Sequence, residues 1–238
     1  MSLKKSRRYQ ECLEKVPEGK VSVPEAVKAV KAMDGAKFDQ TVELSLSLGL
    51  NPRQADQNLR GSVSLPHGIG KTRRVIAFCE GEDVEKAKEA GAVEAGSDEL
   101  VEKIEGGWME FDVAVADPQV MKKISRLGRV LGPQGLMPSP KAGTVVEDVA
   151  TAVREYSAGK VEYRTDTGGN IHVPVGKTSF EDQKLVENTN AMLDMVRRMR
   201  PSSVKGTYMR RATLSATMTP SVDLDLTVRT ISGGNGDE

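Results

Sequence analysis

The stretch from Phe38 to Leu50, FDQTVELSLSLGL, decides the fold of the terminal parts of the chain. From residue 41 onward its polar and apolar residues alternate. A period of two places successive side chains on opposite faces of a β-strand. The stretch therefore predicts a half-buried strand with a polar face toward solvent and with Val42, Leu44, Leu46, Leu48 and Leu50 toward a core.

Helices are predicted before this strand and a second strand after it. Residues 3–16 indicate a short basic helix, and Ser22, Pro24 and Glu25 have the spacing of a capped helix that continues to about residue 35. Residues 58–65 predict a strand, and a cluster of chain breakers follows it. We expect a domain crossing at this cluster, which consists of Pro66, His67, Gly68 and Gly70.

The pattern changes between residues 73 and 160. Apolar strands at 75–78 and 111–116 alternate with helices at 83–90, 98–104, 118–127 and 147–156. Alternating strands and helices predict a small open sheet with helices on its faces.

After residue 160 the pattern of the first third returns. It predicts a hairpin of strands 161–165 and 171–175, a long amphipathic helix over 180–200, and final strands within 207–217 and 222–228. The fold class is therefore mixed, α/β and α+β. Residues 1–68 and 161–238 are expected to form a split α+β domain, and residues 69–160 a domain inserted into it.

Composition sets the broad class of the protein. A length of 238 residues fits two ordinary domains, and no apolar run approaches the roughly 20 residues of a membrane-spanning helix. The basic N-terminus lacks the apolar core of a secretory signal. Cys12 and Cys79 show no pairing or metal-binding pattern. We expect a soluble cytosolic protein with inert thiols and no membrane partner.

Charge is balanced overall but segregated along the chain. The 34 basic and 34 acidic residues cancel, yet residues 80–112 hold twelve acids against three lysines. Residues 122–164 hold eight bases against four acids, and residues 194–211 hold six against one. Local basic faces can bind phosphates even on a neutral protein. Ordinary solvated helix faces explain the pattern equally well.

Nucleotide-binding motifs are incomplete. Segments 70–72 and 176–178 both read Gly-Lys-Thr, the end of a phosphate-binding loop, but Leu65 and Ile171 stand where that motif requires glycine. The run of Gly128, Gly132 and Gly135 lacks the dinucleotide spacing.

A hydrolytic or zinc site is also unsupported. His67 and His172 lie in different segments, and neither has an acidic partner at a recognisable spacing. We therefore predict no catalytic residue, no metal and no cofactor, and a protein that is not an enzyme.

Five motifs occur in an order that covers nearly the whole chain. They are AKF at 36–38, DQNLRG at 56–61, LPHGIG at 65–70, LGPQGLMPSPKAGT at 131–144 and SATM at 215–218. With these motifs the chain resembles the L-one family of large-subunit ribosomal proteins.

The resemblance implies a fold and a set of partners. The inserted domain would be a Rossmann-like, three-layer α/β domain. The protein would bind a stem-loop junction of large-subunit rRNA and form the mobile stalk at the ribosomal exit site for deacylated tRNA, whose release it assists. It would also repress translation of its own operon by binding a similar mRNA element, and it would be a cytoplasmic, ribosomal protein that is monomeric outside the ribosome.

The resemblance also assigns RNA-binding residues to the split domain. In the pattern of the strand, Thr41 and Glu43 lie on the polar face, where a hydroxyl and a carboxylate can meet riboses. Lys37 would meet phosphate, and Phe38 would stack on RNA or belong to the core. The implied set is Lys37, Phe38, Thr41, Glu43, His172, Thr217 and Met218. The next two residues, Thr219 and Pro220, depart from the glycine that is usual in the family.

A second contact is expected on the inserted domain. Lys122, Lys123, Arg126 and Arg129 lead into a loop over 132–141 and suggest a surface for transient tRNA contact. Two alternatives remain open: a nucleotide-dependent enzyme built on the inserted domain, and a general basic interaction module.

Overall fold

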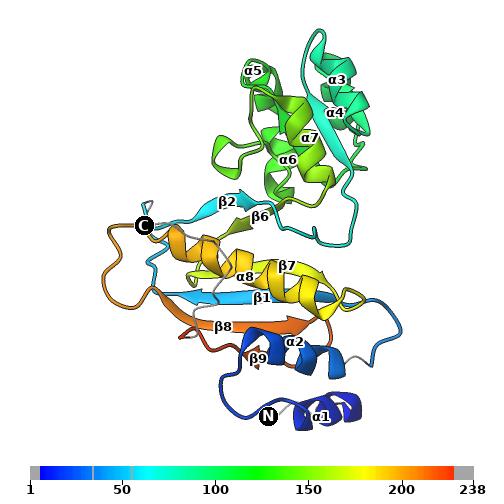
Figure 1. Cartoon of the computed structure of the whole chain (residues 1–238). Coiled ribbons are helices and arrows are strands. Elements are labelled where there is room, and N and C mark those ends of the chain that lie inside the picture. Colours follow the sequence, from blue (N-terminus) through cyan, green and yellow to red (C-terminus); the bar gives the residue numbers. More distant parts are fainter. Residues whose placement is uncertain (1–5, 34, 55, 228–238) are drawn as a thin grey trace, which may run out of the picture. The chain divides into compact units, whose positions relative to one another are not determined.

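The computed structural model describes residues 6–33, 35–54 and 56–227, and these divide into two compact units (Figure 1). The outer unit takes the chain up to residue 59, residues 65–70 and the chain from residue 164 onward. The inner unit takes residues 60–64 and 71–163. The sequence placed the domain boundaries after residues 68 and 160, whereas the chain changes units after residues 70 and 163, and residues 60–64 join the inner unit.

The outer unit is built on a four-stranded antiparallel sheet of order β7-β1-β8-β9. The strands are β1 (Thr41–Leu48), β7 (Asn170–Lys177), β8 (Met209–Ala216) and β9 (Val222–Asp223). Along β1, buried and partly exposed residues alternate without a break. Val42, Leu44, Leu46 and Leu48 are buried, as the period of two predicted. Leu50, which was predicted to face the core as well, lies beyond the end of β1 and is only partly buried.

Helices cover one face of this sheet. Helix α8 (Asp182–Arg198) contacts β7, and α2 (Val23–Ala32) contacts β8 and β9 (Figure 1). The predicted capping box of α2 is confirmed, because the Glu25 carboxylate accepts hydrogen bonds from the Ser22 N–H (3.2 Å) and hydroxyl (2.9 Å). Helix α1 is shorter than predicted and runs from Arg7 to Glu14, while residues 1–5 lie outside the described residues.

The predicted hairpin at 161–175 is wrong. Strand β6 (Val161–Arg164) pairs with β2 (Arg60–Val63), whereas β7 pairs with β1. Within the described residues, the two predicted arms are joined by a single antiparallel bridge, between Thr165 and Ile171. The chain changes units after residue 163, so the two arms join different sheets.

The inner unit is a three-layer α/β structure. Its parallel sheet has the order β4-β3-β5, with β3 (Val75–Phe78) at the centre and β5 (Val113–Ala116) and β4 (Glu94–Gly96) beside it. All four residues of β3 are buried. Ile76 and Phe78 enter the core on one face, and Val75 and Ala77 enter the core on the other.

Helical segments pack on both faces of this sheet. One core includes residues of α3 (Asp83–Glu89) and α7 (Val149–Ser157). The other includes residues of α4 (Asp98–Glu105) and of the α5, η1 and α6 segments (Met121–Ile124, Ser125–Leu127 and Gly128–Gln134). Mixed α/β architecture, the predicted fold class, is confirmed.

Two elements of the inner unit were not predicted. Strand β4 consists of Glu, Ala and Gly, which are uncommon in strands, and parallel pairing with β3 decides its structure. Helix α6 contains Pro133 and was expected to be partly a loop. Its Leu131 is fully buried in the core, so tertiary packing overrides weak helix propensity there. The helix expected to begin at residue 118 begins at Met121.

No described helix is both long enough and apolar enough to cross a membrane.

Candidate nucleic-acid interface

The sheet of the outer unit has a second face that carries polar side chains. We call it the open face, and on β1 it consists of Thr41, Glu43, Ser45 and Ser47, all partly exposed. Strand pairing extends this face on both sides of β1. Ser45 lies opposite His172 and Thr213, and Ser47 lies opposite Asn170 and Arg211.

Hydrogen bonds join three strand ends at one corner of the open face. The Thr217 hydroxyl accepts a hydrogen bond from the Thr41 N–H at 3.1 Å. Lys177 Nζ donates to the Thr41 hydroxyl at 2.8 Å, and the Met218 N–H donates to the buried Gln40 side chain at 2.8 Å. The start of β1, the end of β7 and the segment after β8 are thereby fixed relative to one another.

Two large apolar side chains are exposed in the segments next to this corner. Phe38, before β1, is 51% exposed, and Met218, after β8, is 48% exposed. Lys37 is exposed as well. Of the two roles left open for Phe38, membership of the core is wrong. An exposed ring next to polar groups is typical of a surface that stacks on a partner.

Charges on the open face are mostly compensated. His172 Nδ1 lies 3.2 Å from Glu43 Oε1 and 3.1 Å from the Ser45 hydroxyl. Its Nε2 lies 3.8 Å from Asp166. The pKa of the Asp166 carboxyl is below its usual value because it accepts hydrogen bonds from Asn170, of which the bond from the backbone N–H has the largest effect. Arg211 pairs with Asp223. Polar groups rather than net positive charge therefore characterise this face.

Sequence spacing gave neither histidine a recognisable acidic partner, but in the structure both lie beside carboxylates. His67 Nε2 lies 2.5 Å from Glu187, and His172 contacts Glu43. A hydrolytic triad does not result, because Ser45 and Glu43 share one ring nitrogen of His172 and Asp166 is beyond hydrogen-bond distance of the other. Within the described residues, no group of three or more His, Cys, Asp or Glu side chains could hold a metal ion.

Thr219 and Pro220 fit the chain through a tight turn. The Thr219 N–H donates to the Ala216 carbonyl at 3.1 Å, and its hydroxyl accepts from the Ala216 N–H at 2.9 Å. Pro220 is buried behind this turn. Thr217 keeps its hydrogen bond with Thr41 beside this turn.

A family model described as the ribosomal protein L1p/L10e family matches residues 28–220. The chain belongs to this family. The large ribosomal subunit protein uL1 of Limosilactobacillus reuteri is 53% identical to it over 228 residues, which are 95% of this chain and 99% of that protein. The protein of the same name from Beutenbergia cavernae is 52% identical over 221 residues, 92% of this chain and 93% of its own.

Membership confirms the resemblance inferred from the five motifs and the ribosomal location that it implied. The L1p/L10e family is a family of ribosomal proteins. Cys79 of this L1-family chain agrees with the expectation of inert thiols, since burial, followed by nearby carboxylates, raises the pKa of its thiol to about 11.

The basic residues expected on the inner unit differ in how they are paired. Lys123 Nζ lies 2.6 Å from Glu80 and 3.1 Å from Asp98, and Arg126 lies 3.5 Å from Glu105. The hydrogen bond with Glu80 raises the pKa of Lys123 and lowers that of Glu80. Lys123 and Arg126 therefore contribute less free positive charge than the sequence suggested. Lys122 and Arg129 are exposed, and no ion pair within residues 71–163 includes them.

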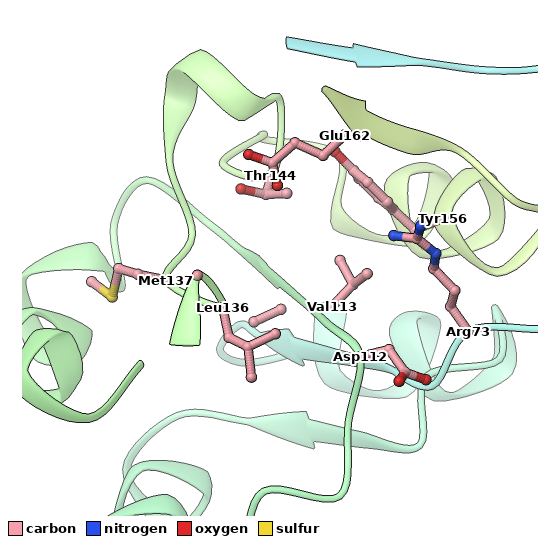
Figure 2. A pocket seen from close by; sticks show the side chains of 10 residues that line it. Arg73, Asp112, Val113, Leu136, Met137, Thr144, Tyr156 and Glu162 are labelled. Carbon is pink, nitrogen blue, oxygen red and sulfur yellow. The ribbon is translucent and has the colours of Figure 1, made fainter. Parts of the chain in front are cut away.

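A small pocket lies in the inner unit of this L1-family protein (Figure 2). Arg73, Asp112 and Val113 line it, so it lies at the amino ends of β3 and β5. Nucleotides in open α/β sheets bind at the carboxyl ends of the strands. Its volume of about 50 Å³ has room for a few water molecules. This pocket therefore gives the nucleotide-dependent enzyme no support.

Proposed function

We propose that this L1-family protein is a structural constituent of the large ribosomal subunit and that it binds a folded stem-loop junction of rRNA through the open face. The observation that carries the proposal is the corner where Thr217 bonds to Thr41. Around it lie residues from segments far apart in the sequence that family resemblance links to RNA. They are Lys37, Phe38, Thr41, Glu43, His172, Thr217 and Met218.

The chemistry of the open face suits RNA. Hydroxyls, a carboxylate and an imidazole can all bond to a ribose 2′-hydroxyl, which is the group that distinguishes RNA from DNA. Glu43 is suited to accept such a bond because its carboxylate is partly exposed on the open face, beside His172. Phe38 supplies an apolar surface for a sugar or a base.

Internal hydrogen bonds also prepare the corner for binding. The Met218 N–H and the Thr41 N–H are both already bonded within the protein. The backbone around Thr217 therefore needs little ordering when RNA binds, and less entropy is lost on association. Such a preorganised surface favours one RNA shape over others.

The sparse free charge predicts how binding depends on salt. Lys37 and Lys177 are the cations at the corner, while His172 and Arg211 lie beside carboxylates. Few phosphates would be neutralised, so affinity would fall gently as salt rises. A general basic module would lose affinity steeply and would bind any duplex equally.

The finer role that we propose is the mobile stalk at the ribosomal exit site, where the protein assists release of deacylated tRNA. Lys122 and Arg129 are the cations of the inner unit that support a transient tRNA contact. If so, replacing this pair by alanine slows release, whereas replacing the paired Lys123 and Arg126 by alanine changes release less. Unaltered tRNA release in the variant of Lys122 and Arg129 would contradict the proposed tRNA contact.

The same surface supports a regulatory role. An mRNA element that copies the rRNA junction would meet the same groups on the open face, so the free protein, as a monomer, would repress its own operon. Repression and rRNA binding then require the same residues. A variant that lost one activity and kept the other would contradict this part.

The test of the main proposal compares two RNAs. Affinity of the wild-type protein is measured for the rRNA stem-loop junction and for an unrelated RNA duplex over a series of salt concentrations. We expect a preference of at least a hundredfold for the junction and a shallow salt dependence. Equal affinity for both RNAs with a steep salt dependence would favour the general basic module instead.

A further inference from the structure

A second feature of the open face lies farther along β1 than the corner at Thr41. It is a hollow of about 200 Å³ on the outer unit. The side chains that line it include Ser45, Ser47, Asn170, His172, Arg211 and Thr213. With the exception of His172, none of these residues belongs to the set assigned above to RNA binding.

Strand register explains why the surface is hollow there. One row across the sheet is His172, Ser45 and Thr213, and the next row is Asn170, Ser47 and Arg211. The middle strand contributes small serines in both rows. Longer side chains stand on either side, His172 on β7 and Arg211 on β8, so the serines form a floor between two walls.

Arg211 is held in a fixed orientation. Its Nε and Nη2 donate to the two carboxylate oxygens of Asp223, each at 2.9 Å. A bidentate pair of this kind fixes the plane of the guanidinium group. Asp223 also neutralises the positive charge of Arg211. The Arg211 side of the hollow therefore offers a flat guanidinium surface rather than a strong phosphate-binding cation.

The chemistry of the hollow fits one class of ligand. Planar guanidinium groups and imidazole rings are the surfaces on which unstacked RNA bases stack, and hydroxyl and amide groups read base edges. The volume is also suitable, since a cavity of about 150 Å³ accepts a benzene ring. A bare phosphate is a poorer match, because Arg211 is neutralised by Asp223.

We propose that the hollow accepts one unpaired nucleobase of the bound RNA, which stacks on the Arg211 guanidinium and is read at its edge by Ser45, Ser47 and Thr213. The inference rests on the proposed RNA-binding function and extends it. The corner at Thr217 recognises the junction, and the hollow makes binding depend on the identity of one extruded nucleotide.

The experiment uses a set of junction RNAs, each lacking the base of one nucleotide, and measures their affinity for wild type and Arg211→Lys. The lysine keeps the charge beside Asp223 but removes the planar surface. At one nucleotide, loss of the base should weaken wild-type binding roughly tenfold. Arg211→Lys should weaken binding of the intact RNA by a similar factor. The affinity of this variant should not fall further when that base is removed from the RNA.

Two further variants keep the test decisive. Ser47→Ala leaves the ion pair between Arg211 and Asp223 in place and should couple to the same nucleotide. Arg210→Lys is the matched control on the adjacent residue of β8, which lies outside the residues that line the hollow. Its effect should be additive with loss of the base at every position.

The outcomes separate this inference from the proposed function. One outcome is that wild type prefers the junction while the effects of Arg211→Lys and Ser47→Ala are additive with removal of every base. In that case the hollow is not a base-binding site and the proposed function stands. If wild type shows no preference for the junction over a duplex, both fail.

Discussion

The Thr217 hydroxyl accepts a hydrogen bond from the Thr41 N–H at 3.1 Å, although the two residues are 176 positions apart. The bond joins the segment after β8 to the start of β1. It makes one surface from groups at opposite ends of the chain, and the proposed binding of RNA depends on that surface.

Glu43 tests whether the open face recognises RNA by hydrogen bonds or by charge. If its carboxylate accepts a bond from RNA, Glu43→Ala should weaken junction binding about tenfold, in line with hydrogen bonds to charged groups. Glu43→Gln keeps an acceptor and should weaken binding less. Titration of both variants at constant salt decides the question, and tighter binding by Glu43→Ala would mean that the carboxylate only repels RNA.

Phe38 separates binding from stability. Because its ring is 51% exposed, Phe38→Ala should change the free energy of unfolding by less than about 0.5 kcal/mol. It should weaken junction binding roughly tenfold through loss of stacking. Val93, which is 50% exposed in the inner unit, is the control, and Val93→Ala should alter neither quantity. A large loss of stability in Phe38→Ala would place the ring in the core after all.

Asn188 holds the segment at 65–70 against α8. Its side chain is fully buried, accepts from the His67 N–H at 3.1 Å, and donates to the Gly68 and Val175 carbonyls at 2.9 and 2.8 Å. Asn188→Leu leaves these groups unpaired and should cost about 2–4 kcal/mol of unfolding free energy. Chemical denaturation measures the change, with the exposed Gln183→Leu on the same helix as a control. Equal stability of the two variants would contradict this role.

Asp166 gives a pH dependence with a defined sign. The pKa of its carboxyl is lowered in the folded protein, first by the Asn170 backbone N–H. Its contribution to stability is therefore complete above the unfolded pKa of about 3.9 and is lost as pH falls through the folded value. Thermal unfolding between about pH 2 and pH 6 should show a smaller acid loss for Asp166→Asn than for wild type. An identical acid loss in both proteins would rule out this contribution.

Local patterns in the sequence predict much of this fold. Strand β1 follows from the alternation between Val42 and Leu48, and the start of α2 follows from Ser22 and Glu25. Both signals depend on neighbouring residues. Elements that depend on distant partners were missed or misassigned. Strand β4 was missed because its pairing with β3 decides its structure.

The same limit applies to the site. Alternation alone places Thr41 and Glu43 on a polar face, but it gives no sign that Thr217 lies beside Thr41, and family resemblance supplied that residue. Ser45, Ser47 and Thr213 were missed although their polar positions follow from the same alternation on β1 and β8. The pairing of Lys123 with Glu80 and Asp98 could not be predicted from the sequence because the partners belong to other segments.

The most direct test of the central claim is the affinity of Thr217→Val and Thr217→Ser for the rRNA stem-loop junction, measured beside wild type and beside Thr72→Val, an exposed threonine of the inner unit. Valine removes the hydroxyl and keeps the shape, whereas serine keeps the hydroxyl. We predict a loss of tenfold or more in Thr217→Val, near wild-type affinity in Thr217→Ser and no change in Thr72→Val. Wild-type affinity in Thr217→Val would contradict recognition of RNA at this corner.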